Sequence, residues 1–280
     1  MRVGHNDQLG ELTEWLADAA RRAGMANDGG RPELVETWQS RTATLHRFSW
    51  VDPSLPDVVV KLHRTPAETQ AHFESMRQVA RTLEQVPRSD IAVVRPLDIS
   101  LDLRAVVMPF MAGESLSSQL IYGDWSSKAA RDGVRALVNR CGALLADYHS
   151  NQSDVSDEAR QEAANRLKTR VERALGRKVD LAGVPASGPV VQCYRDFHPG
   201  HVIVTPERKL ALIDPPIENR YDYFYRDLAL FSHSLFMGLI EPRGMRRNPT
   251  RARHRALLSE AFLEGYAAST NRSLTDVDIF

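Results

Sequence analysis

The sequence predicts an α+β fold whose β-rich first part, residues 1–111, precedes a mostly helical second part, residues 112–280. Two observations support this prediction. Segments with strand composition are concentrated before residue 111, and helical patterns of apolar residues dominate after it. The length of 280 residues suits either one large domain or two tightly packed lobes.

The first part begins with an amphipathic helix, because Leu12, Leu16 and Ala20 repeat at helical spacing and Gly24 follows them. Asn27–Pro32 has the composition of a loop, and the Val, Thr, Trp and Phe residues after it predict strands. The remaining elements expected here are a strand pair within Leu34–Trp50, a buried strand at Asp57–His63, a helix at Pro66–Val86, and strands at Ile91–Leu97 and Arg104–Pro109.

The second part is mainly helical and contains one small hairpin after a preceding strand. Its apolar spacing predicts a long buried helix around Val134–Tyr148 and a more charged helix around Ala164–Leu175. The other expected elements are hairpin strands at Val202–Thr205 and Leu210–Ile213, and closing helices near Asp227–Leu239 and Arg251–Ala268.

Composition excludes several classes of protein. Lys+Arg and Asp+Glu both total 36, so no overall positive charge is available to hold nucleic acid. Cys141 and Cys193 lie among apolar residues and outside any metal-binding spacing, which predicts two reduced core thiols. The N-terminal residues do not resemble a signal peptide and no apolar stretch could span a bilayer, so we expect a cytoplasmic protein.

The segment from Gln192 to Leu228 carries the most informative chemistry. Asp196 lies in a short loop between a strand and the hairpin, and Asp214 ends the second hairpin strand. Phosphoryl transfer needs two such acids, one to orient the attacking hydroxyl and one to hold Mg²⁺ against the phosphates. The ordered set of loop, hairpin and terminal acid therefore indicates phosphoryl transfer.

Tyr194–Val204, followed by Ile213-Asp214, resembles the H-G-D-F-H-P-G-N-V-L-V segment and following I-D of aminoglycoside phosphotransferases. These enzymes are small-molecule members of the protein-kinase-like superfamily, and the resemblance covers most of residues 34–240. It implies a bilobal fold with ATP and Mg²⁺ as cofactors, Asp196 as catalytic base and Asp214 as metal-binding acid. It also implies that Asp227 braces the catalytic loop, with ordinary capping or turn chemistry as the alternative for these acids.

Two residues depart from that family pattern. His201 replaces the usual Asn, the second metal ligand, and Tyr194 replaces the leading His. A neutral imidazole can ligate Mg²⁺ or Mn²⁺ although hard cations prefer oxygen, so both readings of His201 stay open. At this point the chain is more similar to the lipopolysaccharide-core (Kdo and heptose) kinases, whose loop reads R-D-x-x-x-x-H. Asp214-Pro215-Pro216 lacks the Phe-Gly of protein kinases, which argues against an activation-loop switch.

The first lobe supplies candidate nucleotide-binding residues. Lys61 interrupts the apolar strand VVVKL, which costs desolvation unless an anion meets the ammonium group. An edge-strand lysine whose ammonium group reaches solvent is the alternative. By the resemblance, that anion is nucleotide phosphate together with a helix carboxylate, for which Glu68 and Glu74 both qualify. Glu74 is favoured because its E-x-M-x-x-V context is expected to face a core.

Two further segments match parts of a nucleotide site. Val106–Leu116 resembles the strand, hinge and helix that hold adenine, with Met108, Pro109 and Met111 as candidate contacts. No Gly-rich phosphate loop occurs between Leu34 and Ser49, so Ser40 and Arg41 are the candidates for covering the phosphates.

These residues predict a kinase that phosphorylates a hydroxyl of a sugar-containing small molecule or glycolipid. The arginine-rich segment 242–255 is either a solvated face or the contact for an anionic partner, such as a phosphorylated glycolipid or the inner membrane surface. His198 is expected either to line the acceptor site or to pack the loop, and His149 to be structural. An antibiotic phosphotransferase and a non-catalytic nucleotide-binding protein are the alternative functions.

Overall fold

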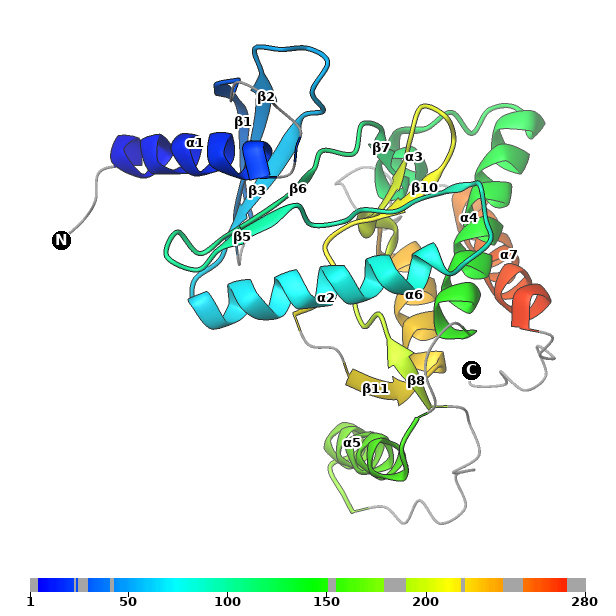
Figure 1. Ribbon diagram of the computed structural model, residues 1–280. Helices are drawn as coiled ribbons and strands as arrows, with labels where there is room; N and C mark the ends of the chain where they lie inside the picture. Colours follow the sequence, from blue (N-terminus) through cyan, green and yellow to red (C-terminus); the bar gives the residue numbers. More distant parts are fainter. Residues whose placement is uncertain are drawn as a thin grey trace. The chain divides into compact units, whose positions relative to one another are not determined.

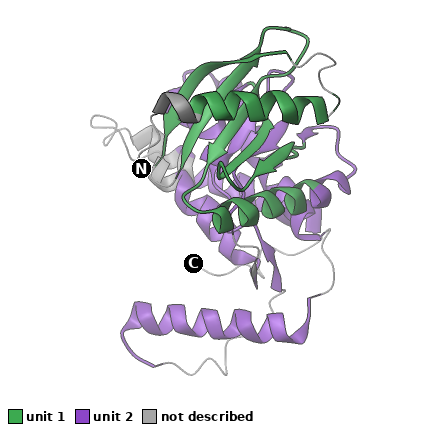
Figure 2. Ribbon diagram, turned by 60° about the vertical axis from the view of Figure 1, so that its left-hand side comes forward, with its two compact units in different colours: residues 1–80, 93–112 green, residues 81–92, 113–280 purple. Residues whose placement is uncertain are grey.

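The computed structural model describes residues 5–22, 24, 30–40, 43–150, 155–178, 190–217, 220–238 and 249–270 (Figure 1). The chain forms two compact units (Figure 2). The first contains residues 1–80 and 93–112, and the second residues 81–92 and 113–280. Residues 81–92, which the sequence analysis assigned to the first lobe, thus belong to the second unit. The α+β class is confirmed.

The first unit is built on a five-stranded antiparallel sheet. Its strand order is β1-β2-β3-β6-β5. β-branched and aromatic residues favour these strands, and the short connections between β1, β2 and β3 make them antiparallel neighbours. The strands are β1 Pro32–Gln39, β2 Thr44–Trp50, β3 Val58–Leu62, β5 Asp98–Ser100 and β6 Ala105–Pro109.

Helix α1, His5–Arg22, covers one face of this sheet with the predicted apolar stripe. Leu12 and Leu16 pack in one cluster with Val58 and Val60 of β3. Successive strand residues point to opposite faces, so Lys61 belongs to the other face of β3.

Helix α2, Pro66–Glu84, packs on the face of the sheet that Lys61 shares. His63, two residues beyond Lys61, places its Nε2 3.1 Å from Nδ1 of the buried His72 on α2. The backbone N–H of Glu68 donates to the Thr65 hydroxyl at 3.2 Å, which caps the start of the helix.

The second unit is mainly helical, as predicted. Helices α4 and α7 pack closely along each other, and α6 contacts α7. The apolar stripe of α4 is completely buried, which is why its periodicity was visible in the sequence. The helices are α3 Leu116–Tyr122, α4 Lys128–Ser150, α5 Asp157–Leu175, α6 Tyr225–Gly238 and α7 Pro249–Thr270.

Two small sheets complete the second unit. One has the order β4-β10-β9-β7 and contains the predicted hairpin, and the other pairs β11 with β8. The one-turn helix η1 leads directly into β9. These elements are β4 Ile91–Ala92, β7 Glu114–Ser115, β8 Val190–Cys193, η1 Pro199–His201, β9 Val202–Val204, β10 Leu210–Leu212 and β11 Arg220–Tyr223.

One expected strand is wrong. Ile91–Leu97 is a strand only at Ile91–Ala92, which pairs in parallel with β10 of the second unit. Pro96 has no N–H for a ladder, and pairing with β6 begins where the Leu97 N–H donates to the Val107 carbonyl at 2.8 Å. No helix among the described residues is both long and apolar enough to cross a membrane.

Candidate active site

The predicted loop and hairpin form one continuous structure in the second unit. Strand β8 leads into Tyr194-Arg195-Asp196, and η1 leads into β9. Beyond β10, the N–H of Ile213 donates to the His201 carbonyl at 3.0 Å, which extends the hairpin to its final residue before Asp214. Both predicted carboxylates therefore lie at the same end of the hairpin.

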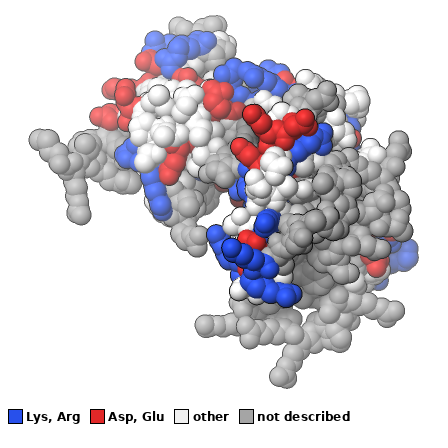
Figure 3. Space-filling model, turned by 90° about the horizontal axis from the view of Figure 1, so that it is seen from below, with Lys and Arg blue, Asp and Glu red and all other residues white. Residues whose placement is uncertain are grey.

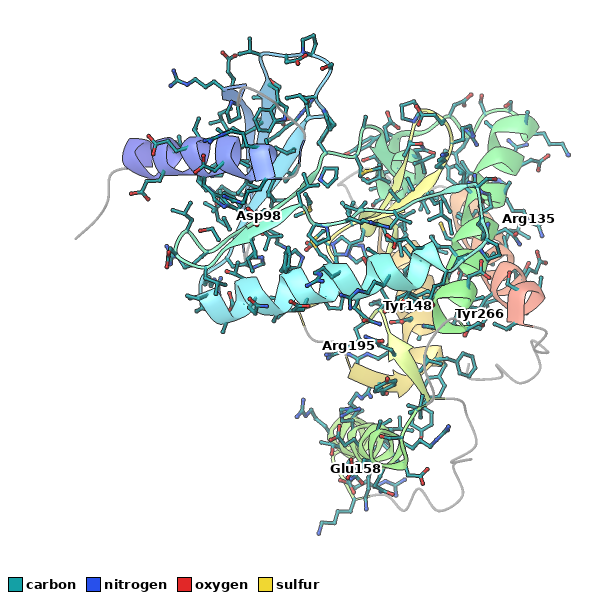
Figure 4. The ribbon with its side chains drawn as sticks, viewed as in Figure 1. Asp98, Arg135, Tyr148, Glu158, Arg195 and Tyr266 are labelled. Atoms are coloured by element: carbon teal, nitrogen blue, oxygen red, sulfur yellow. The ribbon has the colours of Figure 1, made fainter. Side chains whose placement is uncertain are left out.

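The backbone is strained at Asp214 itself and at Arg195, the residue before Asp196. Arg195 and Asp214 have φ angles of 64° and 57°, in the left-handed region that non-glycine residues rarely adopt. The carboxylate of Asp227, at the start of α6, accepts the backbone N–H groups of Tyr194 at 2.6 Å and Arg195 at 2.7 Å. These two charge-assisted hydrogen bonds hold the strained residue that directly precedes Asp196. Figure 4 labels Arg195 in this loop.

Tyr194, which replaces the usual His, has a structural role. Its side chain is 1% exposed, and its hydroxyl donates to the Ile213 carbonyl at 2.9 Å. Its ring meets Phe197 edge to face, with centroids 5.7 Å apart. Tyr194 thereby ties the loop that carries Asp196 to the strand end that carries Asp214.

His201 lies between the two predicted acids. Its Nδ1 is 3.1 Å from the Asp196 backbone carbonyl and 3.5 Å from an Asp196 carboxylate oxygen, and its Nε2 is 3.9 Å from an oxygen of Asp214. A carbonyl can only accept, so in the neutral ring Nδ1 carries the proton and Nε2 keeps its lone pair on the side of Asp214. This is the arrangement in which a histidine can ligate a metal.

His198 packs against His201, with ring centroids 3.8 Å apart. Its Nδ1 accepts the N–H of Gly200 at 3.0 Å, and its Nε2 is 3.8 Å from Asp196. Burial lowers the pKa of His198, and the neighbouring His201 lowers it further. His198 thus makes the contact expected of a residue that packs the loop, and its Nε2 also lies near Asp196, where an acceptor site was expected.

The site is accessible and its donor atoms suit a divalent cation. The side chains of Asp196 and Asp214 are 49% and 37% exposed. An imidazole nitrogen beside a carboxylate can bind Mn²⁺ or Mg²⁺. It is the less favourable ligand for Mg²⁺, because this harder ion prefers oxygen. Asp196, His198 and His201 also have donor atoms within 4.8 Å of one another. The arrangement can hold a cation and, separately, align a hydroxyl at Asp196.

Lys61 belongs to the first unit and is buried at 8% exposure on the α2 side of β3. It pairs in register with Leu45 of β2 and Val106 of β6, so the sheet fixes its backbone on both sides. The predicted position of this lysine inside an apolar strand is correct. Its proposed contact with nucleotide phosphate stays a prediction.

The context of Glu74 faces a core, as expected, since Met76 and Val79 are buried, but the Glu74 side chain does not share that burial. The Glu74 side chain is 50% exposed; it accepts from Gln70 at 3.1 Å and lies 3.6 Å from Arg77. Glu68 accepts the Arg64 N–H at 3.2 Å near the helix start. The buried stripe of α2 instead presents Thr69, His72, Ser75 and Met76. The pairing of Lys61 with either acid stays untested.

The remaining candidates also lie in or near the first sheet. Met108 is buried on β6, Pro109 pairs with Val58, and Met111 is half-buried just beyond the strand. The hydroxyl of Ser40 donates to the Ala43 carbonyl and accepts the Ala43 N–H, both at 2.9 Å, so it closes the β1–β2 turn. Arg41 lies outside the described residues, and so do residues 242–248 of the arginine-rich segment 242–255.

The sequence analysis did not predict the hydrogen bonds that support Asp227. His149 of α4 places Nε2 3.1 Å from Asp227 and Nδ1 2.9 Å from the hydroxyl of Tyr266 on α7. Cys193 completes a group with the composition of a metal site, but burial raises its thiol pKa well above the usual value. The donor atoms of His149 and Asp227 are already hydrogen-bonded, so this group is a structural network. In the sequence, only the expectation that His149 is structural pointed toward this network.

A family model and several solved structures match this chain. The model of the family described as "Phosphotransferase enzyme family" matches residues 46–237. Among solved structures, amicoumacin kinase hAmiN, in complex with AMP-PNP, Ca²⁺ and Ami, has a TM-score of 0.55 at 13% identity over 88% of this chain and 75% of its own. Macrolide 2'-phosphotransferase MphH from Brachybacterium faecium has a TM-score of 0.49 at 20% identity, over 94% of each chain. A comparison with curated proteins finds no match.

Proposed function

Because this chain belongs to the phosphotransferase enzyme family, we propose that it transfers the γ-phosphoryl group of ATP to a hydroxyl of a sugar-containing small molecule or glycolipid. The observation that carries the proposal is the placement of His201, 3.5 Å from the Asp196 carboxylate and 3.9 Å from that of Asp214. In this arrangement Asp214 is available to a cation and Asp196 to an acceptor hydroxyl, and phosphoryl transfer requires both.

Each residue has a distinct role in this proposal. Asp214 and Nε2 of His201 would hold a divalent cation, which neutralises charge on the phosphates when it is bound. Asp196 orients the acceptor hydroxyl and accepts its proton as transfer proceeds. Lys61, fixed by the sheet of the first unit, would contact phosphate as a compact positive charge. Met108, Pro109 and Met111 would contact the adenine.

The charges beside the loop favour a neutral or anionic acceptor. Arg170 on α5 and Arg226 on α6 both bind the buried Asp222 of β11, at 2.6 and 2.7 Å. Arg166 donates to the Tyr221 carbonyl on the same strand. Two arginines thus bind one carboxylate, and a third binds the backbone of the same strand, which pairs with β8; this excess of positive charge disfavours a polycation. Over the wider face drawn in Figure 3, basic and acidic side chains are interspersed.

An ADP-release assay with ATP and either Mg²⁺ or Mn²⁺ tests the proposal. The acceptor panel contains neutral sugars, sugar phosphates, a lipopolysaccharide-core glycolipid, aminoglycosides and a macrolide, and mass spectrometry identifies the product. We expect acceptor-dependent ADP release with a neutral or anionic sugar, and its loss in Asp196→Asn. Turnover restricted to aminoglycosides would overturn the acceptor assignment while retaining the phosphotransferase.

Two other functions remain as outcomes of that assay. Antibiotic phosphorylation has some support, since hAmiN shares the fold and its complex contains amicoumacin, but likeness at 13% identity extends only to the fold. A non-catalytic nucleotide-binding protein would bind ATP without releasing ADP for any acceptor. The exposed and adjacent Asp196 and Asp214 favour an enzyme over this alternative.

A further inference from the structure

Helices α4 and α7 touch through their backbones at two glycines. A Cβ on Gly142 would lie 1.9 Å from the Phe262 carbonyl oxygen, and a Cβ on Gly265 would lie 1.9 Å from that of Asn139. Neither position accepts a side chain without moving a helix. This contact fixes the depth at which the residue after Gly265 enters the core.

That residue is Tyr266, whose side chain is 1% exposed (labelled in Figure 4). Its ring stacks on Phe224, with centroids 5.8 Å apart and planes 12° apart, and meets His149 edge to face at 5.7 Å. These contacts leave the ring one orientation, in which the hydroxyl is 2.9 Å from Nδ1 of His149.

The hydrogen bonds that follow have one consistent direction. The Asp227 carboxylate can only accept, so Nε2 of His149 carries the proton and donates to it at 3.1 Å. Nδ1 of the neutral ring is then an acceptor and must receive the Tyr266 O–H. The same carboxylate accepts the N–H groups of Tyr194 and Arg195. An uninterrupted chain therefore connects α7 to the residue before Asp196.

We propose that Tyr266 is a positioning residue, which acts through His149 and Asp227 to hold the strained Tyr194–Arg195 backbone and so aims Asp196. The proposal rests on the proposed phosphotransferase function for its kinetic consequence, but not for its structural one. Fixing His149 fixes the Asp227 carboxylate, and this carboxylate fixes the φ of 64° at Arg195. The last helix thereby contributes to catalysis without touching a substrate.

The test uses Tyr266→Phe, which removes only the hydroxyl, with Asn139→Ala as matched control. Asn139 also joins the two helices, donating to the Ala261 carbonyl at 3.0 Å, but it does not touch His149. Amide hydrogen exchange is measured at Tyr194 and Arg195, and kcat and KM for ATP are measured with the best acceptor. We expect faster exchange at both amides in Tyr266→Phe alone. We also expect kcat to fall about tenfold while KM for ATP stays nearly unchanged. This loss of rate is smaller than the ~10²-fold cost of a 1 Å misplacement, because Asp227 keeps its other hydrogen bonds.

Equal exchange and equal kcat in the two variants would overturn the proposal, because the hydroxyl would then serve only to dock α7. If Tyr266→Phe does not fold, His149→Gln replaces it, since its amide can still donate to Asp227 but loses the link to Tyr266. Faster exchange in His149→Gln supports the proposal, and unchanged exchange contradicts it. When all variants fold, adding Tyr266→Phe to His149→Gln should change kcat no further. Exchange needs no turnover, so a wild-type protein without activity would refute the proposed function but still test this connection.

Discussion

Asp196 and Asp214 are positioned by backbone geometry that costs free energy and is maintained by specific hydrogen bonds. Asp214 itself and Arg195, beside Asp196, have positive φ angles. Strain of this kind costs about 1–3 kcal/mol per residue and persists only where the surroundings enforce it. Here the surroundings are the Asp227 carboxylate and the Tyr194 hydroxyl. Tyr194 differs from the family pattern in sequence, and its role in holding the loop explains why it is buried.

Replacing Asp196 by Asn should separate binding from transfer. The amide keeps the size of the side chain but removes its charge and its capacity to accept a proton. We expect transfer to fall by roughly 10²–10⁴, the usual range for a positioned base. Nucleotide affinity, measured by titration with ATP, should change little, because Lys61 and Asp214 are the proposed contacts. Loss of ATP binding with a normal rate per bound ATP would make Asp196 a structural residue.

Replacing His201 by Asn should change the metal preference. The substitution exchanges an imidazole nitrogen for an amide oxygen, which the harder Mg²⁺ prefers. We expect the ratio of Mg²⁺-supported to Mn²⁺-supported kcat/KM to rise by about tenfold, within the range seen when metal surroundings change. Asp214→Ala, which removes the carboxylate anchor, should abolish turnover with either metal. An unchanged ratio in His201→Asn would exclude His201 as a ligand.

The two thiols should be unreactive in the folded protein. Burial raises the pKa of Cys141 to about 12 and that of Cys193 well above its usual value. The thiolate is the reactive form, so almost none is present at pH 8. We expect iodoacetamide to modify neither cysteine in the native protein and both in urea, as read by intact mass. Rapid native labelling would contradict the buried positions.

At the scale of elements, the long helices and the three-residue strands of the β9–β10 hairpin were predictable from the sequence, whereas the two-residue strands were not. The buried stripe of α4 extends over several turns, so its period is evident in the sequence. β4 and β7 contain two residues each and are defined by pairing with distant partners, which local pattern does not encode. Glu74 illustrates a related limit. It lies beside the buried stripe of α2, and its neighbours Met76 and Val79 are core residues, yet its own side chain faces solvent.

The α4–α7 contact gives a prediction with an internal control. Gly142→Ala places a methyl group against the backbone of α7, and overpacking of this kind typically costs 1–3 kcal/mol, so we expect about that loss in the free energy of unfolding. Gly133→Ala lies on the same helix, where a Cβ meets nothing within 4 Å, and should stabilise by about 0.5–1 kcal/mol through helix propensity. Urea denaturation measures both. Destabilisation of equal size in the two variants would show that the α4–α7 contact does not decide the outcome.

At the scale of the whole molecule, the residues proposed to bind nucleotide are distributed over both compact units. Lys61 belongs to the sheet of the first unit and Asp214 to the hairpin of the second. The sequence predicted each local setting correctly, because an apolar strand and a terminal hairpin acid are local patterns. It could not show that Asp227 is supported through His149 and Tyr266, since those residues are far apart in the chain and meet only by helix packing.

The proposed binding of ATP through both Lys61 and Asp214 predicts a stabilisation of the protein that depends on each residue. ATP with Mn²⁺ at about 100 times Kd should raise the free energy of unfolding by about 2.7 kcal/mol, seen as an increase in Tm. We expect Lys61→Ala and Asp214→Ala each to lose most of that increase at the same ligand concentration. Lys209→Ala, in the exposed turn of the hairpin, removes the same charge and should retain it. A full ligand-induced increase in Tm in Lys61→Ala would show that nucleotide binds without this lysine and would refute its place in the proposed site. The role of Asp214 as metal ligand is tested separately, by Asp214→Ala.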